Sequence, residues 1–142
     1  MAISRASASL RLFSTKAAAA VVTETLGLDP TTAAERGEPI GKSISTLREQ
    51  SMWLLESEAE PTEPLSAHLE WLLDELDGKL GALAGLSGDF EVDVWCTVEA
   101  TNGQGQLTFT PALTARLAGL PCPFSVDLYL GDAEDEDEED EF

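Results

Sequence analysis

The sequence of 142 residues has few basic residues and no long apolar run. Against 27 Asp and Glu it has only 8 Lys and Arg, which gives a formal net charge of −19. A chain this acidic repels nucleic acid and anionic membranes, which argues against direct binding to either and favours basic partners. No apolar stretch approaches the ~18 residues that a membrane-spanning helix needs.

The sequence also lacks the residue combinations of common catalytic and metal sites. His68 is the only histidine, and no G-x-S-x-G motif is present, so nucleophilic catalysis has no recognisable residues. His68 precedes Leu69 at the edge of a leucine stripe, which predicts a boundary position on a helix. Cys96 and Cys122 lie far apart and predict neither a disulfide framework nor a metal site. We expect a reduced, cytoplasmic protein without cofactor or metal.

Two glycine-containing segments look like nucleotide-binding loops but do not fit. In RGEPIGKS, at 36–43, the glycine that a phosphate-binding loop requires five residues before Gly41 is Arg36. The second segment, 103–105, is Gly-Gln-Gly and is not followed by the helix of a dinucleotide-binding motif. We interpret the first as a surface loop and the second as a hairpin connection.

The most regular pattern is a strict alternation of apolar and polar residues in the stretch 89–110. A period of two is typical of a strand with one buried and one solvated face. The predicted inward residues are Phe90, Val92, Val94, Cys96, Val98 and Ala100. Asn102-Gly103 then predicts a tight hairpin turn, and alternation resumes over 106–110. This stretch therefore predicts a β-hairpin.

The remaining elements follow from helical spacing, caps and shorter alternating runs. Strands are predicted at 4–14, 50–57 and 124–130. Helices are predicted at about 15–26, capped by Ser14 or Thr15 and ended by Gly27, at 65–86 along a leucine stripe, and at 110–119 with Thr110 as N-cap and Pro111 first. The segments 31–45 and 58–64 are predicted to be loops.

The order strand, helix, strand, helix, strand, strand, helix, strand indicates an α+β fold. We expect one mixed or antiparallel sheet of about five strands with three helices on one face. Residues 1–131 would form a single domain, and 132–142, with nine acids, a disordered acidic tail. Residues 1–23 contain no acid, as in an organellar transit peptide, but the alternation from Ala6 to Leu12 favours a first strand.

Several short motifs together resemble the bacterial family called domain of unknown function 4279. They are LGLDPT at 26–31, RGEPIGK at 36–42, SMWLLESE at 51–58, the stretch NGQGQLTFTPALTARLAGL at 102–120, and FSVDLYL at 124–130. The resemblance implies no catalytic residues, because the family has no assigned activity. It implies a small accessory protein, since some members look like immunity proteins encoded beside toxins.

The polar face of the predicted sheet is the candidate partner-binding site. It would combine aromatic residues, which are enriched at interface hot spots, with acids that steer a basic partner. The residues are Glu91, Asp93, Trp95, Glu99, Asp127 and Tyr129. Two alternatives remain at this point. Glu91 and Asp93 could hold a cation or act as a carboxylate pair, and Trp95 and Tyr129 could be covered by the loops at 31–45 or 58–64.

The sequence thus favours a non-enzymatic protein that recognises a basic protein, with an immunity or antitoxin role as its sharpest version. The acidic tail would either solubilise the chain or mimic nucleic acid. A small hydrolytic or metal-dependent enzyme is one alternative. A structural subunit that makes contacts through Trp53 or the long helix is another. The sequence does not indicate an oligomeric state.

Overall fold

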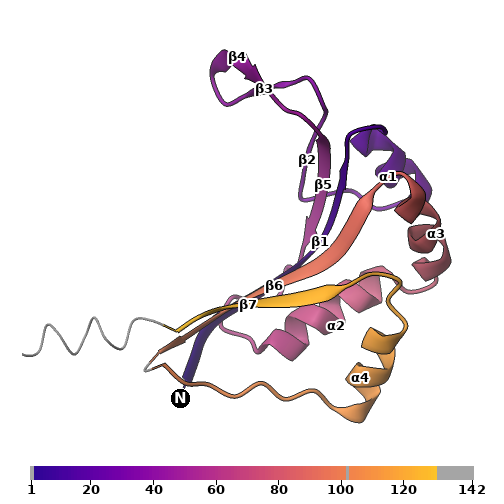
Figure 1. Cartoon of the computed structure of the whole chain (residues 1–142). Helices are drawn as coiled ribbons and strands as arrows, with labels where there is room; N and C mark the ends of the chain where they lie inside the picture. The colour runs from indigo at the N-terminus through magenta and orange to yellow at the C-terminus, as the bar shows by residue number, and fades with distance from the viewer. Residues whose placement is uncertain (1, 102, 131–142) are drawn as a thin grey trace, which may run out of the picture.

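A mixed five-stranded sheet is the centre of the computed structural model, which describes residues 2–101 and 103–130 (Figure 1). The strand order is β2-β5-β1-β6-β7. All neighbours are antiparallel except β6 and β7, which are parallel. The bounds in this order are Thr32–Ala34, Ser51–Glu56, Ala2–Ser14, Glu91–Thr101 and Phe124–Tyr129. The α+β class and the five-stranded sheet are confirmed.

The helices lie on one face of this sheet and leave the other face open, as Figure 1 shows. In chain order they are α1 Ala19–Leu26, α2 Leu65–Glu75, α3 Leu80–Gly85, the 3₁₀ turn η1 Leu86–Gly88, and α4 Pro111–Ala118. None of the helices in the described part is long and apolar enough to cross a membrane. The predicted tail, 132–142, lies outside the described residues.

The core lies between the sheet and the helices, as the alternation predicts. In β6 the residues Val94, Cys96, Val98 and Ala100 are buried. The antiparallel partners of the first three, in β1, are buried as well, and that of Ala100 is partly buried. The leucine stripe supplies the helical side of the core, with Leu65, Leu69, Leu72, Leu76 and Leu83. Thus the two apolar periods in the sequence meet in one core.

Local end signals are largely confirmed, but the long helix is broken. Gly27 ends α1 with a φ of 69°, and the Thr110 hydroxyl accepts a hydrogen bond from the Leu113 N–H at 3.2 Å. The predicted helix 65–86 was wrong as one piece, because α2 ends at Glu75 and Gly78 has a φ of 77°. Only glycine adopts that conformation without strain, so the chain turns there before α3.

The predicted hairpin after β6 was wrong. Residues 104–110 form no strand, and the two neighbours of β6 in the sheet are β1 and β7. Since β7 runs parallel to β6, the chain must cross over to the far end of the sheet before it re-enters. Residues 104–110 and α4 make that crossover. Phe109 is not part of a strand paired with β6, and its ring packs against that of Phe124 with the ring centroids 6.3 Å apart.

The predicted loop 31–45 was also wrong in part. It contains β2, at the edge of the main sheet, and part of a small separate sheet of two strands. The first of these strands lies wholly within 31–45 and the second lies mostly within it. That sheet consists of β3 Pro39–Ile40 and β4 Ser43–Leu47 and extends away from the main body (Figure 1). Strands this short carry too little alternation to be recognised from sequence.

Glu35, just after β2, fixes the start of α1. Its carboxylate accepts hydrogen bonds from the N–H groups of Ala19 and Ala20, at 2.8 and 3.1 Å. The N-cap residue of α1, Ala18, makes no side-chain cap bond. The predicted cap, Ser14, instead accepts from the N–H groups of Lys16 and Ala17 ahead of the helix. The Glu35 carboxylate, which is distant in sequence, therefore caps α1 in place of a residue at the start of the helix.

We predict that Glu35→Ala lowers the free energy of unfolding by about 1 kcal/mol, because two N–H groups at the positive end of α1 lose their acceptor. Urea unfolding followed by circular dichroism measures the change. Glu24→Ala is the matched control, since Glu24 is an exposed acid on the same helix. An equal loss in both variants would contradict the capping role.

Candidate functional site

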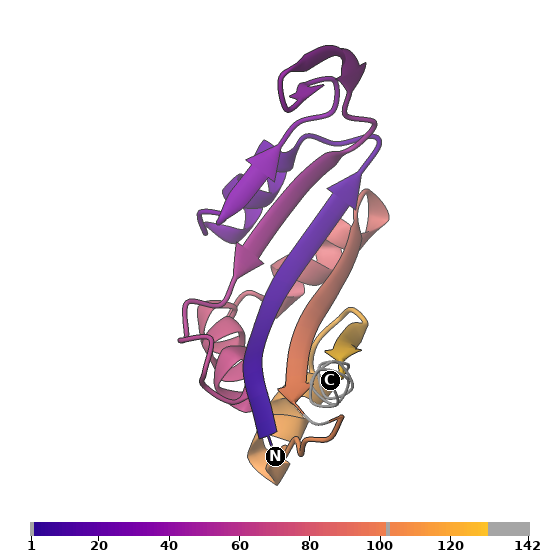
Figure 2. The same ribbon diagram turned by 90° about the vertical axis from the view of Figure 1, so that its left-hand side faces the viewer.

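The open face of the sheet, which is turned toward the viewer in Figure 2, carries all six predicted partner-binding residues. Within β6, Glu91, Asp93, Trp95 and Glu99 are spaced by two or four residues and so lie on the same side. The parallel register places Asp127 beside Thr97 and Tyr129 beside Glu99. Residues paired across a ladder share a face, so the sheet brings the six together.

Arg11 occupies the centre of this face. Its Nε and Nη2 groups donate to the two carboxylate oxygens of Asp93 at 2.8 and 2.9 Å. The guanidinium carbon also lies 4.5 Å from the ring centroid of Trp95 and 5.3 Å from that of Phe13. The hydrogen bond to Asp93 raises the pKa of Arg11 above its ordinary value, against the effect of burial. This is a bidentate ion pair held between two aromatic rings.

The other acids of the face are less constrained. Glu99 lies 3.9 Å from Arg5 in a well-exposed pair, which is a weak interaction in water. Glu91 is exposed. The Tyr129 hydroxyl is hydrogen-bonded to Asp127, which raises the pKa of Tyr129, and the Tyr129 residue is 55% exposed. The expected alternative that a loop covers Tyr129 was wrong, and the Arg11 guanidinium lies over the Trp95 ring.

A carboxylate pair of Glu91 and Asp93 is poorly placed for metal or acid–base chemistry. Both oxygens of Asp93 are already bound to Arg11, so a cation would have to displace a guanidinium. Across residues 2–101 and 103–130, no three His, Cys, Asp or Glu side chains gather in a way that could hold a metal ion. What the face offers chemically is recognition by charge and aromatic surface.

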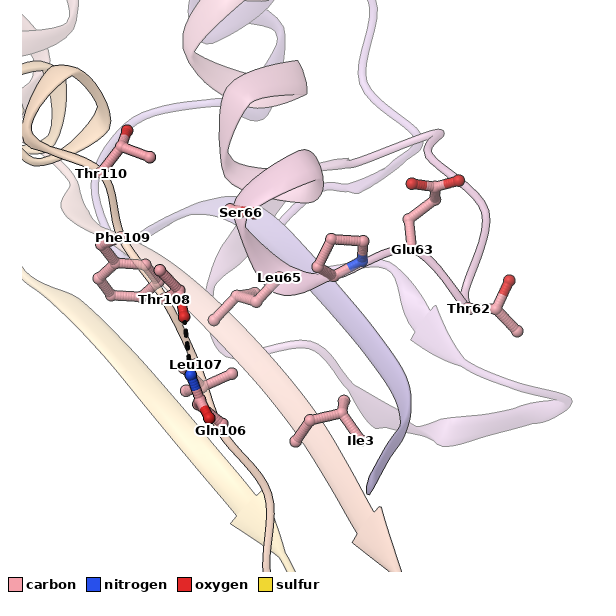
Figure 3. Close-up of a pocket in the computed structure, with 11 residues that line it drawn as sticks. Ile3, Thr62, Glu63, Leu65, Ser66, Gln106, Leu107, Thr108, Phe109 and Thr110 are labelled. Atoms are coloured by element: carbon pink, nitrogen blue, oxygen red, sulfur yellow. Dashed lines mark hydrogen bonds between the residues drawn. The ribbon is translucent and has the colours of Figure 1, made fainter. Parts of the chain in front are cut away.

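A pocket of about 420 Å³ opens at the end of the sheet near the start of α2 (Figure 3). It lies between Ile3, the segment 62–66 and the segment 106–110. Its volume would suit a small molecule. However, Glu63 is its only titratable residue, and the polar contact within it is a bond of 3.4 Å from Gln106 Nε2 to Thr108 Oγ1. Without converging polar groups it supports no specific chemistry.

His68 is buried, so the predicted boundary position was wrong. It is only 2% exposed, and its Nδ1 lies 2.9 Å from the Ser57 hydroxyl oxygen. Its Nε2 has no hydrogen-bond partner among the described residues. Burial lowers the pKa of His68, although the backbone carbonyls of Glu60 and Glu63 oppose that effect. The groups that contact it, on Ser57, Glu60 and Glu63, belong to the segment just before α2, and such contacts leave no trace in the helical period.

The two cysteines are free thiols, one buried in the core and one half-buried near the start of β7. Burial raises the pKa of Cys96 to about 12. Burial, followed by the negative charge of Asp93, raises the pKa of Cys122 to about 11. Because the thiolate is the reactive form, neither side chain is an activated nucleophile.

Comparison with known proteins assigns the chain to one family. A family model described as "Domain of unknown function (DUF4279)" matches residues 4–131, nearly the whole chain. This agrees with the motifs found between residues 26 and 130. No curated protein and no solved structure matches significantly.

We predict that acidification through the titration range of His68 destabilises the fold. Since the folded-state pKa lies below the ordinary value of 6.5, the unfolded chain binds the proton more tightly. The contribution of His68 to stability is therefore complete above pH 6.5 and is lost as the pH falls below it. His68→Asn should remove this part of the pH dependence of Tm. NMR titration of the single imidazole reads the pKa directly, and a value above 6.5 would contradict the prediction.

We also predict that neither thiol of the folded protein is alkylated by iodoacetamide at about pH 8, because little thiolate forms there. Mass spectrometry should show no adduct on the native chain and two after unfolding in guanidinium. Thr114→Cys, at an exposed position on α4, should react as a free thiol and serves as the control. Rapid native labelling of Cys122 would show that the thiol is activated.

Proposed function

The chain belongs to the DUF4279 family, and we propose that it is a non-enzymatic binding protein that recognises a basic surface on another protein. The open face of the sheet is the binding surface, with Glu91, Asp93, Trp95, Glu99, Asp127 and Tyr129 as its residues. The partner is met in the cytoplasm, where free cysteines such as Cys96 and Cys122 persist.

The observation that carries the proposal is an uncovered sheet face that combines aromatic side chains with surplus carboxylates. On β1, β5, β6 and β7 this face carries two arginines and five acids, which leaves three negative charges. These residues are Arg5, Arg11, Glu56, Glu91, Asp93, Glu99 and Asp127. Negative charge of this kind raises the association rate of a basic partner and disfavours acidic ones.

Arg11 and Asp93 give this surface a fixed centre. The bidentate pair orients the Trp95 ring before a partner arrives, so little side-chain entropy is lost on binding. Trp95 and the exposed Tyr129 supply the amphipathic area typical of hot spots. Glu91, Glu99 and Asp127 stand around them and would meet the partner's Lys and Arg side chains.

The two alternative functions have less support. An enzyme using Glu91 and Asp93 would first have to break the bond between Asp93 and Arg11. A structural subunit making contacts through Trp53 is disfavoured, because Trp53 is fully buried and its Nε1 donates to the Thr23 hydroxyl at 2.9 Å. The leucine side of the long helix faces the core as well.

An immunity or antitoxin role is the most specific form of the proposal. In that case the partner is a basic toxin, and its gene would stand beside the gene for this chain in many genomes. The nine acids at 132–142 would add long-range attraction to such a partner. Absence of a neighbouring toxin gene across the relatives would rule out this role, but it would leave the proposal of a protein that binds a basic partner unaffected.

We predict that Trp95→Ala weakens binding of the native partner about 30-fold, because a central aromatic anchor is lost. The partner is first identified by mass spectrometry after capture on the full chain, and its Kd is then measured by calorimetry with purified protein. Trp71→Ala is the matched control, since Trp71 is a half-buried tryptophan on α2.

Charge is tested in the same assay. Glu91→Lys should slow association and flatten its salt dependence, whereas Glu70→Lys on the exposed side of α2 should change the Kd by no more than about twofold. Equal effects of the sheet-face variants and their helix-face controls would overturn the proposal.

A further inference from the structure

The two edges of the main sheet differ in how they are protected. β2, at one edge, has three residues and leads into the small sheet of β3 and β4. β7, at the other edge, has six residues, and no described strand pairs with its outer side. A strand edge of this length offers a row of backbone groups to another chain. β7 is therefore the edge that can accept a further strand.

The register identifies which backbone groups of β7 face outward. The Val94 N–H donates to the Pro123 carbonyl at 2.9 Å, immediately before β7 begins. In a parallel ladder the backbone groups of alternate residues point to the same neighbour. Ser125, Asp127 and Tyr129 therefore direct their N–H groups to β6. Phe124, Val126 and Leu128 direct theirs to the open side.

The two faces beside this edge differ in chemistry. On the helix side, Leu128 is 52% exposed and Leu130 is 41% exposed, and both line a hollow of about 390 Å³. Leu107, 39% exposed, lines the same hollow from the crossover segment. On the open side stand Asp127 and Tyr129, with Glu99 on the adjacent strand. A strand added here would meet apolar side chains on one face and carboxylates on the other.

We propose that an extended segment of the partner, with alternating apolar and basic residues, adds to β7 as a sixth strand. This rests on the proposed function and specifies how the basic partner is held. Its apolar side chains enter the hollow beside Leu128, and its basic side chains reach Asp127 and Glu99. Its backbone bonds to the outward groups of Val126 and Leu128.

Charge argues against a second copy of this chain as the occupant. Pairing of two β7 edges would bring Asp127 and Glu99 of both copies together at a net charge of −19 per chain. Like charges across a ladder are destabilising. A basic segment has no such penalty. A dimer by sedimentation, with β7 amides protected from exchange in the absence of any partner, would overturn the proposal in favour of self-pairing.

The first test follows amide hydrogen exchange in the full chain by NMR. The probe is a short blocked peptide that alternates lysine and valine. In the free protein the amides of Asp127 and Tyr129 should exchange slowly and those of Val126 and Leu128 quickly. Binding should slow the latter two at least tenfold. A peptide of the same composition, with lysines and valines in separate blocks, is the control. Equal binding of both peptides would indicate charge attraction alone and overturn the proposal.

The second test removes one outward N–H group. Leu128→Pro deletes that donor but leaves every bond between β6 and β7, and Leu128→Ala removes the side chain while keeping the donor. Leu128→Pro should bind the alternating peptide about tenfold more weakly than Leu128→Ala. Melting curves establish that both variants fold. If Leu128→Pro does not fold, the exchange pattern in the unmodified chain decides.

The proposed binding function of the open face and the proposed strand addition to β7 can each fail while the other stands. If the native partner depends on Trp95 but leaves Val126 and Leu128 amides unprotected, strand addition is wrong and the open-face binding function stands. If the alternating peptide protects these amides but Trp95→Ala and Glu91→Lys leave partner affinity unchanged, the edge is a binding site and the wider face is not. Absence of peptide binding at millimolar concentration overturns strand addition.

Discussion

The antiparallel pairing of β1 with β6 is the constraint on which both the core and the candidate site depend. Its register sets Leu10 opposite Val94 on the helix side and, one residue on, Arg11 opposite Asp93 on the open side. Because side chains alternate along a strand, a shift by one residue would move the leucines into water and the ion pair into the core. The cost of such a shift fixes the register, and the register in turn assembles the guanidinium, the carboxylate and the Trp95 ring.

Covering only one face of the sheet has consequences for the other. The open face must present side chains that tolerate water, yet β1 and β6 are long strands whose central residues lie far from any edge. The side chain of Arg11 is 29% exposed and that of Asp93 is 28% exposed. The ion pair meets both demands, because the two charges neutralise each other and the guanidinium covers part of the Phe13 and Trp95 rings. The ordered centre and the freer acids around it are thus products of the same one-sided packing.

Features encoded within one element were predictable from the sequence, whereas features that depend on contacts between distant segments were not. The period of two over 90–100 and the leucine stripe from Leu65 identified the core, because each pattern is complete within one element. The hairpin failed because Asn102-Gly103 indicates a turn but not which strand fills the place beside β6, and β7 fills it. The six residues of the candidate face were found from alternation. Arg11 was missed as their central partner, since it is 82 residues from Asp93 and only the sheet register brings them together.

The acidity of the chain is consistent with an edge that stays open. Proteins commonly protect a long edge strand with lysine, proline or a bulge, but β7 has exposed Leu128 and Tyr129 and none of these within Phe124–Tyr129. At a net charge of −19, two copies approaching edge to edge repel each other, and that repulsion grows as they close. The same field attracts a basic chain. Negative charge can therefore replace the usual protection of an edge and, at the same time, select the partner that is allowed to pair with it.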